Sequence, residues 1–177
     1  LRQDIIWHKP NPMPESVRDR CTKAHEYIFV LTKSAKYYFD AEAIAEPVAA
    51  STVVRAKSDN NADKRKDGGA AVNQCGLTLE QQNKYYADIS AKSVRNKRSV
   101  WTVATKPFKG AHFATFPPDL IEPCILAGSK PGDVVLDPFF GSGTTGQVAQ
   151  ALGRRWLGIE LNPEYLKLAE LRTAQNW

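Results

Sequence analysis

Short apolar runs, separated by charged or proline-rich stretches, predict the strands of the first two thirds of the chain. Residues 4–9 and 25–33 are rich in β-branched and aromatic side chains, which are typical of buried strands. Residues 37–40 predict the returning strand of a hairpin, with 33–36 as its turn. Residues 99–105 predict another strand, because apolar and polar positions alternate there.

Helices alternate with strands in the last third of the chain. Helices are predicted at 118–127, 144–152 and 163–173, and strands at 134–137 and 156–161. Short apolar strands that alternate with helices indicate a parallel sheet with helices on both of its faces. The predicted fold class is therefore α/β with a mostly parallel sheet.

The middle of the chain, residues 50–99, has a different composition. Residues 51–100 carry ten Lys/Arg against five Asp/Glu, so this segment holds the whole net charge of +5. Asn and Gln side chains lie between the cations, and Tyr85-Tyr86 is the one aromatic pair. Cations mixed with amides suit contacts to phosphates and base edges. A solvated, lysine-rich loop has the same composition, so a polyanionic partner and a flexible insertion both stay open.

Several classes of protein and site are disfavoured by composition. No apolar run approaches the roughly 20 residues that span a bilayer, and no secretory signal pattern begins the chain. Cys21, Cys75 and Cys124 are odd in number and far apart, which indicates neither a disulfide framework nor a zinc site. We therefore expect a cytoplasmic protein without a membrane partner and without a metal.

Residues 137–146 carry the pattern with the clearest chemistry. Asp137 ends an apolar strand, and a glycine-rich turn leads into the helix at 144–152. Glycines let a backbone approach a ligand closely, and the N–H groups of a helix N-terminus point toward it. Because ligands bind at the carboxyl ends of strands in such sheets, Asp137 and Glu160, each at the end of a predicted strand, are expected in one site.

The ligand is not identified by the glycines alone. Residues 141–146 match G-x-G-x-x-G, so a dinucleotide oxidoreductase is one alternative. Against it, Asp137 and Pro138 precede the glycines, where a carboxylate would repel a pyrophosphate. A triphosphatase loop is disfavoured because no Gly-Lys-Ser/Thr follows. A ligand with an adenosine and a cationic tail fits better, and S-adenosylmethionine has both.

Two carboxylates are assigned to the two ends of this ligand. Glu160 is expected to accept the ribose hydroxyls, and Asp137 to face the charged methionine end. Phe139 is expected to pack on the adenine, with simple core packing as the alternative. The turn itself is expected to supply close backbone approach and helix-start hydrogen bonds through Gly141, Ser142, Gly143 and Thr144.

These segments together resemble a known family. Residues 137–145 and 158–165 resemble the cofactor-binding end of DNA amino-methyltransferases, which methylate adenine N6 or cytosine N4. Residues 112–117 resemble the family's third cofactor segment, and 7–14 with 25–29 are similar to segments that follow its catalytic strand. The resemblance implies a Rossmann-like S-adenosylmethionine-dependent methyltransferase fold, a double-stranded DNA partner and a place in restriction–modification.

The resemblance also implies a division of the chain and further site residues. Residues 1–49 and 100–177 would form the catalytic domain, and 50–99 the target-recognition insertion. His112, Ala114 and Phe116 would line the cofactor. Asn11 and Met13 would lie near the base pocket, with a rigid proline-rich connector as the alternative. The cations expected to contact DNA are Arg55, Lys57, Lys64, Arg65, Lys66, Arg95, Lys97 and Arg98.

One departure from the family's pattern is important. Its catalytic motif is Asp, Asn or Ser, then Pro-Pro, then an aromatic residue. The only Pro-Pro here, Pro117-Pro118, follows Phe116 and precedes Asp119, which is the wrong chemistry on both sides. We therefore expect the motif upstream of Leu1, a sheet that is incomplete at its N-terminus, and no activity of this chain alone. The alternative is a non-catalytic module that binds cofactor and DNA. The target base, and whether the protein is a monomer or a homodimer, stay open.

Overall fold

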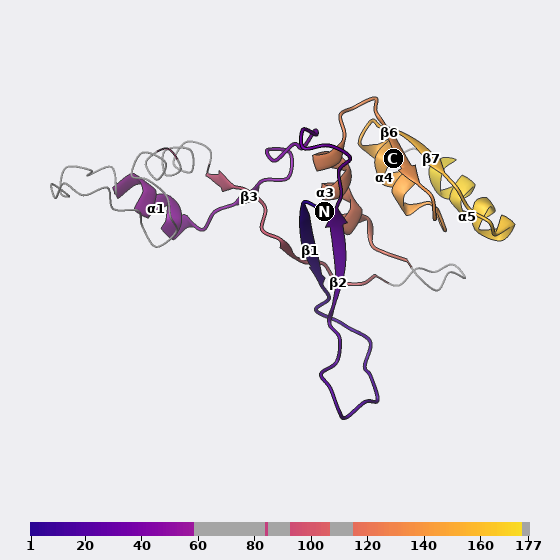
Figure 1. The fold of residues 1–177 in the computed structure, drawn as a ribbon, viewed down its shortest axis with the longest axis horizontal. Coiled ribbons are helices and arrows are strands. Elements are labelled where there is room, and N and C mark those ends of the chain that lie inside the picture. The colour runs from indigo at the N-terminus through magenta and orange to yellow at the C-terminus, as the bar shows by residue number, and fades with distance from the viewer. Residues whose placement is uncertain (59–83, 85–92, 107–114, 175–177) are drawn as a thin grey trace. The chain divides into compact units, whose positions relative to one another are not determined.

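The computed structural model describes residues 1–58, 84, 93–106 and 115–174 (Figure 1). The chain divides into two compact units, one of Leu1–Ile44 with Arg98–Trp177 and the other of Ala45–Lys97. The predicted role of the second unit in target recognition stays a prediction. In the described parts, no helix combines the length and the apolar character needed to cross a membrane.

Three strands of the first unit form a sheet in the order β2-β1-β5. β1 (Gln3–His8) pairs with β2 (His25–Val30) antiparallel and with β5 (Val100–Thr102) parallel. The register places Trp7 beside Trp101, although these residues are far apart in the sequence. The strands predicted at residues 4–9, 25–33 and 99–105 are confirmed.

The strand predicted at residues 37–40 is wrong. In the structure this segment has no strand, and β2 pairs with β1 instead of a following hairpin partner. The Asp40 N–H donates to the Ala127 carbonyl oxygen at 2.9 Å, and the Asp40 side chain accepts the Ala43 N–H. The aromatic residues at 37–39 predicted a strand, but the backbone of the adjoining Asp40 is hydrogen-bonded to Ala127 and its side chain to Ala43.

The last third contains a parallel strand pair with helices. Its elements are α3 (Pro118–Gly128), β6 (Val134–Asp137), α4 (Thr144–Ala151), β7 (Arg155–Gly158) and α5 (Pro163–Ala174). β6 and β7 pair in parallel, from Val134 opposite Arg155 to Asp137 opposite Gly158. The predicted helix–strand alternation is confirmed, although β7 ends before the predicted position 161.

α3 carries side chains of both cores of this unit. Leu120 is buried against Ile5, Trp7 and Trp101 of the β2-β1-β5 sheet. Ile125 is buried with Val148 and Ala149 of α4, and Val135 and Trp156 pack on the same cluster. Residues spaced by four lie on the same side of a helix, whereas Leu120 and Ile125 are five positions apart. They therefore lie on different sides of α3, and each side packs on one core.

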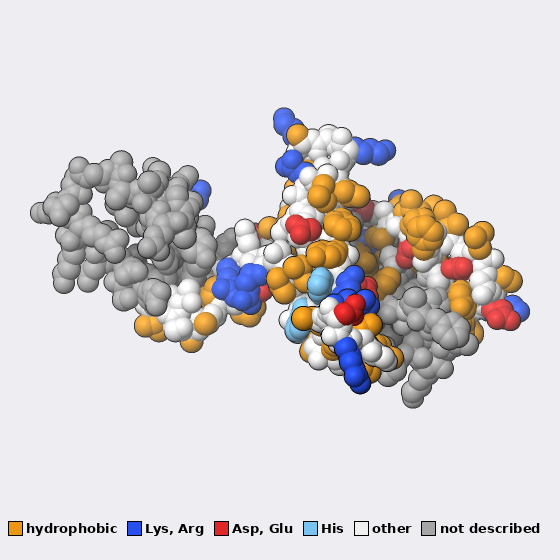
Figure 2. Space-filling view, turned by 60° about the horizontal axis from the view of Figure 1, so that its bottom comes forward, with side chains coloured by type: hydrophobic (Ala, Val, Ile, Leu, Met, Phe, Trp, Pro, Cys, Tyr) orange, Lys and Arg blue, Asp and Glu red, His pale blue; other side chains and the backbone are white. Residues whose placement is uncertain are grey.

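The opposite face of the β6–β7 pair carries exposed apolar side chains. Val134, Leu136 and Leu157 are each more than half exposed, whereas Val135 and Trp156 point into the core. The alternation follows from the strand period of two residues. Exposed hydrophobic side chains are also visible between charged ones in the space-filling view (Figure 2).

The second unit contains a short helix and a short strand pair within its described residues. α1 spans Ala50–Ser58, and β3 (Glu46–Pro47) pairs antiparallel with β4 (Val94–Arg95). The Arg95 Nε donates to the Glu46 carboxylate at 2.9 Å across this pair. The pairing brings together the two ends of the segment that carries the positive charge.

Candidate cofactor site

The carboxyl ends of β6 and β7 place the predicted site residues side by side. Asp137 is the last residue of β6 and pairs with Gly158, the last residue of β7. Glu160 follows two residues later and is partly buried. α4 begins after Gly143, whose φ of 81° lies in the left-handed region that favours glycine. No side chain caps this helix start, and the first N–H groups of a helix are donors that can bind an acceptor.

The Asp137 carboxylate holds the turn to the start of α4. Its Oδ1 accepts the Phe139 N–H at 2.9 Å, and its Oδ2 accepts the Thr145 hydroxyl at 2.6 Å. Thr145 is buried, so this second hydrogen bond lies out of bulk water. Asp137 therefore fixes the local geometry and keeps a negative charge next to the helix N-terminus.

The Glu160 carboxylate holds the glycine turn from the other strand. Its Oε2 accepts the Gly141 N–H at 2.7 Å, and its Oε1 accepts the N–H groups of Leu161 and Asn162, both at 2.9 Å. A carboxylate has about four acceptor positions, and these three hydrogen bonds use most of them to shape the turn. The predicted interaction of Glu160 with a ribose stays a prediction, and its role in shaping the turn is an addition to it.

Phe140 explains one glycine of the G-x-G-x-x-G pattern and one glycine of β7. Its ring stacks on Trp156 with centroids 4.9 Å apart. A Cβ at Gly146 would lie 2.6 Å from this ring, and a Cβ at Gly158 only 2.3 Å from it. Both glycines thus leave room for a buried aromatic ring, and Gly146 is explained without a ligand.

Gly143 also serves internal packing. A Cβ at this position would lie 2.9 Å from the Cβ of Ala169, which is buried on α5. α5 begins where expected, because the Asn162 side chain accepts the Glu164 N–H at 2.9 Å and so caps the helix. Gly143 therefore combines a left-handed backbone with a close approach of α5.

The hydroxyls of Ser142 and Thr144 face a residue that sequence reasoning missed. Both are buried, and the Arg172 Nη1 donates to them at 3.2 and 3.0 Å. The Arg172 Nε also donates to the side-chain oxygen of Gln147 at 2.5 Å. Burial lowers the pKa of this guanidinium. A sequence signal existed, because Arg172 is three residues after Ala169 and therefore on the same side of α5.

The remaining predicted cofactor residues lie in different surroundings. Phe139 is 88% exposed, at the open side of the turn. Phe116 is partly buried and packs against the core of the β2-β1-β5 sheet. His112 and Ala114 lie outside the described residues. The structure thus brings Asp137 and Glu160 together with the turn, and the lining roles of the others stay predictions.

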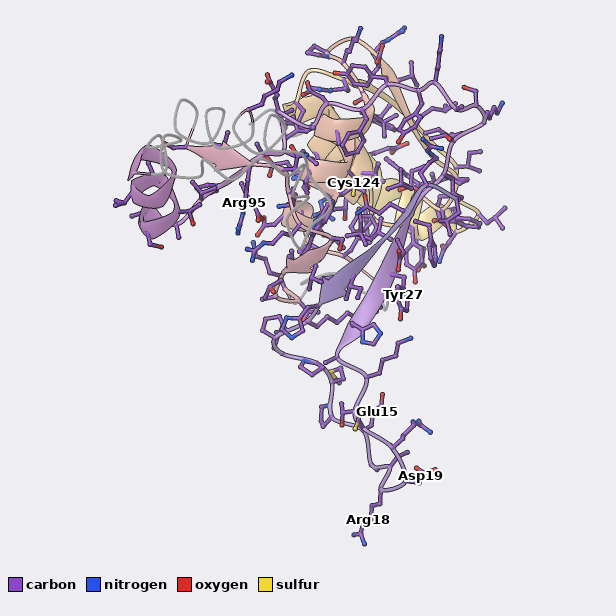
Figure 3. All side chains as sticks on the ribbon, turned by 60° about the vertical axis from the view of Figure 1, so that its left-hand side comes forward. Glu15, Arg18, Asp19, Tyr27, Arg95 and Cys124 are labelled. Atoms are coloured by element: carbon purple, nitrogen blue, oxygen red, sulfur yellow. The ribbon has the colours of Figure 1, made fainter. Side chains whose placement is uncertain are left out.

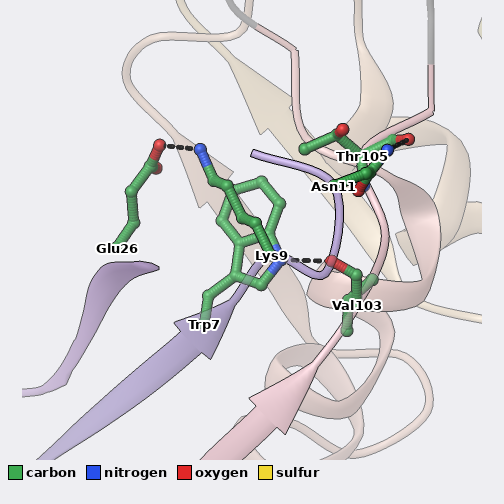
Figure 4. Close-up of polar contacts among 6 residues, drawn as sticks. All are labelled: Trp7, Lys9, Asn11, Glu26, Val103 and Thr105. Carbon is green, nitrogen blue, oxygen red and sulfur yellow. Dashed lines mark hydrogen bonds and ion pairs between the residues drawn. The ribbon is translucent and has the colours of Figure 1, made fainter. Parts of the chain in front are cut away.

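The proline-rich segment after β1 is tied to the strand end after β5 (Figure 4). The Asn11 side chain donates to the Thr105 carbonyl oxygen at 3.1 Å and accepts the Thr105 N–H at 3.0 Å. The Trp7 indole N–H donates to the Val103 carbonyl oxygen at 2.8 Å. Lys9 lies over the Trp7 ring, 4.4 Å from a ring centroid. These contacts favour the rigid-connector interpretation of Asn11.

Charged side chains lie farther along the same segment. Figure 3 shows Glu15, Arg18 and Asp19 on the loop beyond the ends of β1 and β2. Arg20 forms an exposed ion pair with Glu15 at 3.6 Å. Exposed pairs of this kind contribute little to stability.

The predicted DNA contacts are only partly described. Arg55 and Lys57 lie within α1, but their side chains, together with Lys64, Arg65 and Lys66, fall outside the described residues. Arg95 pairs with Glu46 inside the second unit. Lys97 and Arg98 are described, and the Arg98 carbonyl oxygen accepts the Trp101 indole N–H. Among the described residues, no group of three or more His, Cys, Asp or Glu could hold a metal.

Comparison with known proteins gives consistent matches over nearly the whole chain. The sequence pattern of a family described as DNA methylase matches residues 1–171. The type II methyltransferase M.Cfr9I of Citrobacter freundii is 50% identical over 169 residues, which are 96% of this chain and 43% of that protein. The chain thus spans less than half the length of this curated relative.

Solved structures give the same result at the level of the fold. The structure of PvuII DNA methyltransferase, described as cytosine-N4-specific, aligns with a TM-score of 0.63 at 20% identity, covering 98% of this chain and 51% of that one. The complex of M1.HpyAVI with SAM aligns with a TM-score of 0.57 at 25% identity, covering 97% of this chain and 61% of that one.

Proposed function

The chain belongs to the DNA methylase family of N6 and N4 amino-methyltransferases, and from this premise we propose that it forms the cofactor-binding part of an S-adenosylmethionine-dependent DNA methyltransferase. Its fold is the Rossmann-like α/β fold of these enzymes. Transfer of a methyl group to the exocyclic amino group of adenine or cytosine in double-stranded DNA, in restriction–modification, would be the activity of the whole protein.

The observation that carries this proposal is the arrangement of two carboxylates around an uncapped helix start. Asp137 and Glu160 both hold the glycine turn, and both lie at the carboxyl ends of paired strands. Asp137 places a negative charge next to the positive end of α4. Such a pair of opposite charges suits the zwitterionic amino-acid end of S-adenosylmethionine, and a pyrophosphate would be repelled by Asp137.

The residues of the site have separate roles in this proposal. Glu160 would accept the ribose hydroxyls, and Phe139 would pack its exposed ring on the adenine. Asp137 would face the ammonium group. When bound, S-adenosylmethionine supplies an electrophilic methyl group on a good leaving group, so the protein contributes mainly position and water exclusion.

Calorimetric titration of the 177-residue chain with S-adenosylhomocysteine tests the cofactor assignment. We expect binding by the unchanged chain and a clear loss of affinity in Glu160→Ala, because both the ribose contact and the support of Gly141 are removed. Glu170→Ala, an exposed carboxylate on α5, is the matched control. Binding of a nicotinamide dinucleotide in place of the methionine-derived compound would reject the assignment.

The DNA side of the proposal depends on the basic segment of residues 50–99. A protein that neutralises phosphates binds DNA less tightly as salt concentration rises. We expect the double variant with Lys97→Ala and Arg98→Ala to show a weaker dependence of DNA affinity on salt concentration. Fluorescence anisotropy with a labelled duplex measures this dependence. An unchanged salt dependence would show that these two cations do not contact phosphates.

We also propose that the chain alone transfers no methyl groups, since its only Pro-Pro pair has the wrong neighbours. Labelled S-adenosylmethionine and duplex DNA would test this directly. Transfer of label to DNA by the 177-residue chain would contradict it. The same assay on a longer protein that includes the expected motif would identify adenine or cytosine as the target.

A further inference from the structure

Two neighbouring phenylalanines of the glycine turn have opposite surroundings. Phe139 is 88% exposed, whereas Phe140 is 6% exposed. The Phe140 ring stacks on Trp156 with an angle of 15° between the ring planes. One ring of the pair is therefore fixed in the interior, and the other, on the adjoining residue, is open to a ligand.

The Phe140 ring lies in a socket between α4 and β7. Gly146 of α4 and Gly158 of β7 both face the ring, and a Cβ at either position would lie within 3 Å of it. Trp156 of β7 stacks on the same ring. Because protein interiors are close-packed, the ring cannot shift unless one of these two elements moves. The socket thus fixes the position of Phe140 relative to both α4 and β7.

The backbone of Phe140 connects the turn to the segment that follows β7. The Phe140 N–H donates to the Ile159 carbonyl oxygen at 2.9 Å. This bond joins the peptide group after Phe139 to the peptide group before Glu160. The next N–H along the turn, that of Gly141, donates to the Glu160 carboxylate at 2.7 Å. Phe139 and Glu160 therefore flank one backbone hydrogen bond, whose donor is the residue with the buried ring.

We infer that Phe140 is a positioning residue for the adenosine end of the cofactor: its buried ring fixes how Phe139 and Glu160 face the ligand. The inference rests on the proposed function, in which Phe139 packs on the adenine and Glu160 accepts the ribose hydroxyls. The Phe140 ring is buried against Trp156 and would not touch the ligand. A smaller side chain would leave part of the socket empty, so the turn would no longer be held in one position and the two contacts would not be aligned for one ligand.

The variant Phe140→Leu tests this role. We expect the affinity for S-adenosylhomocysteine to fall about tenfold, because the stacked ring that fixes the turn is lost. Calorimetric titration of the 177-residue chain measures the affinity, at a temperature at which thermal melting shows the variant to be folded. Val148→Ala is the matched control, since it removes buried volume from α4 where the side chain packs with Ile125. It should lower the melting temperature and change the affinity less than about twofold. A purely structural role of Phe140 would give both variants the same result.

A second ligand locates the effect within the cofactor. The compound 5′-methylthioadenosine has the adenosine and the thioether without the amino-acid end. Because Phe140 is inferred to position the adenosine contacts, Phe140→Leu should weaken both ligands by a similar factor. A loss for S-adenosylhomocysteine with an unchanged affinity for 5′-methylthioadenosine would overturn the inference.

The variant Gly158→Ala disturbs the same ring from β7. Its new Cβ would lie 2.3 Å from the ring, so we expect a fall in affinity for S-adenosylhomocysteine of about threefold or more. In the Phe140→Leu background the ring is absent, so the added methyl group has less to displace. The loss in the double variant should therefore be smaller than the product of the two single losses. Losses that simply multiply would show that the two residues do not act through one ring.

The outcomes separate this inference from the proposed function. If the unchanged chain does not bind S-adenosylhomocysteine, the proposed function fails and the inference falls with it. If the unchanged chain binds and folded Phe140→Leu binds equally well, the proposed function stands and the inference is overturned. If Phe140→Leu does not fold, the same comparison is made with Phe140→Met, whose flexible side chain fills more of the socket. An unchanged affinity in that variant would overturn the inference in the same way.

Discussion

The β2-β1-β5 sheet and the segment from β6 to α5 are built in different ways. In the sheet, the Trp7 indole bonds to Val103, 96 residues away in the sequence. In the C-terminal segment, Asp137 bonds to Thr145, eight residues away, and Glu160 bonds to Gly141, 19 residues away. The first region depends on contacts that only the folded chain creates, whereas the second forms its site from neighbours in the sequence.

This difference explains why the site is compact although the unit has two cores. A strand, a turn and a helix that follow one another need little loop-closure entropy to meet. The carboxyl ends of β6 and β7 then lie together because parallel pairing aligns them. The N-terminal sheet must bring distant segments together, and it depends on buried aromatic side chains to do so.

Removing the central aromatic residue of the sheet should give the largest effect on stability. Trp7→Ala deletes a buried ring and the indole hydrogen bond, which we expect to lower the free energy of unfolding by about 3–5 kcal/mol. Urea denaturation measures the loss, and hydrogen exchange locates it. Protection should fall more in β1 and β5 than in α4. An equal loss of protection in α4 would show that the sheet and the C-terminal segment unfold together. Trp7→Phe, which keeps a ring, is the milder control.

A methyl group added at the Phe140 pocket should disturb the C-terminal segment. The new Cβ of Gly158→Ala would lie 2.3 Å from the Phe140 ring, so the ring must move. We expect a destabilisation of about 1–3 kcal/mol by urea denaturation. Gly128→Ala is the matched control, because nothing lies within 4 Å of its new Cβ. If both variants were equally stable, the packing explanation of Gly158 would be wrong.

Removal of one local hydrogen bond should have a smaller effect. Thr145→Val keeps the shape of the side chain and removes the hydroxyl that donates to Asp137. We expect a loss of about 1 kcal/mol, because an acceptor loses a buried donor. Hydrogen exchange at the start of α4 should report the change, with β1 and β5 unaffected. A loss spread evenly over both regions would contradict the local character of this contact.

Removal of one exposed ion pair of the first unit, Lys106 with Asp119, should have the smallest effect. Lys106 and Asp119 lie 2.6 Å apart, but both side chains are more than half exposed. We expect Lys106→Ala to change the free energy of unfolding by less than about 0.5 kcal/mol. Thermal melting at low and high salt measures this difference. A larger effect that disappears at high salt would show that the pair is worth more than its exposure indicates.

Much of the secondary structure could be predicted because its signals are local. The helix at Pro163 follows an Asn that caps it, and the strand at Val134 is a short apolar run. The wrong strand at 37–40 shows the limit of such patterns. Its aromatic residues have strand propensity, but a tertiary hydrogen bond from Asp40 to Ala127 replaces the expected ladder.

The candidate site was predicted in position and only partly in its contacts. Asp137 and Glu160 were singled out because each lies at the end of a predicted strand, and in the structure both bond to backbone N–H groups of the same turn. That their carboxylates bond to backbone N–H groups was not predictable, since those bonds depend on side-chain rotamers. Arg172 was missed because the sequence shows only that it lies on the same side of α5 as Ala169, whereas the packing of α5 against the start of α4 is decided by the fold.

The sequence alone determined which residues form the strand, turn and helix around Gly141, because strand period, glycine and helix start act over a few neighbouring positions. Only the tertiary structure decided what the glycines are for. Gly146 and Gly158 accommodate Phe140, and Gly143 accommodates Ala169. The physical reason is that a turn conformation is set locally, whereas the space around a backbone atom is filled by side chains from other elements.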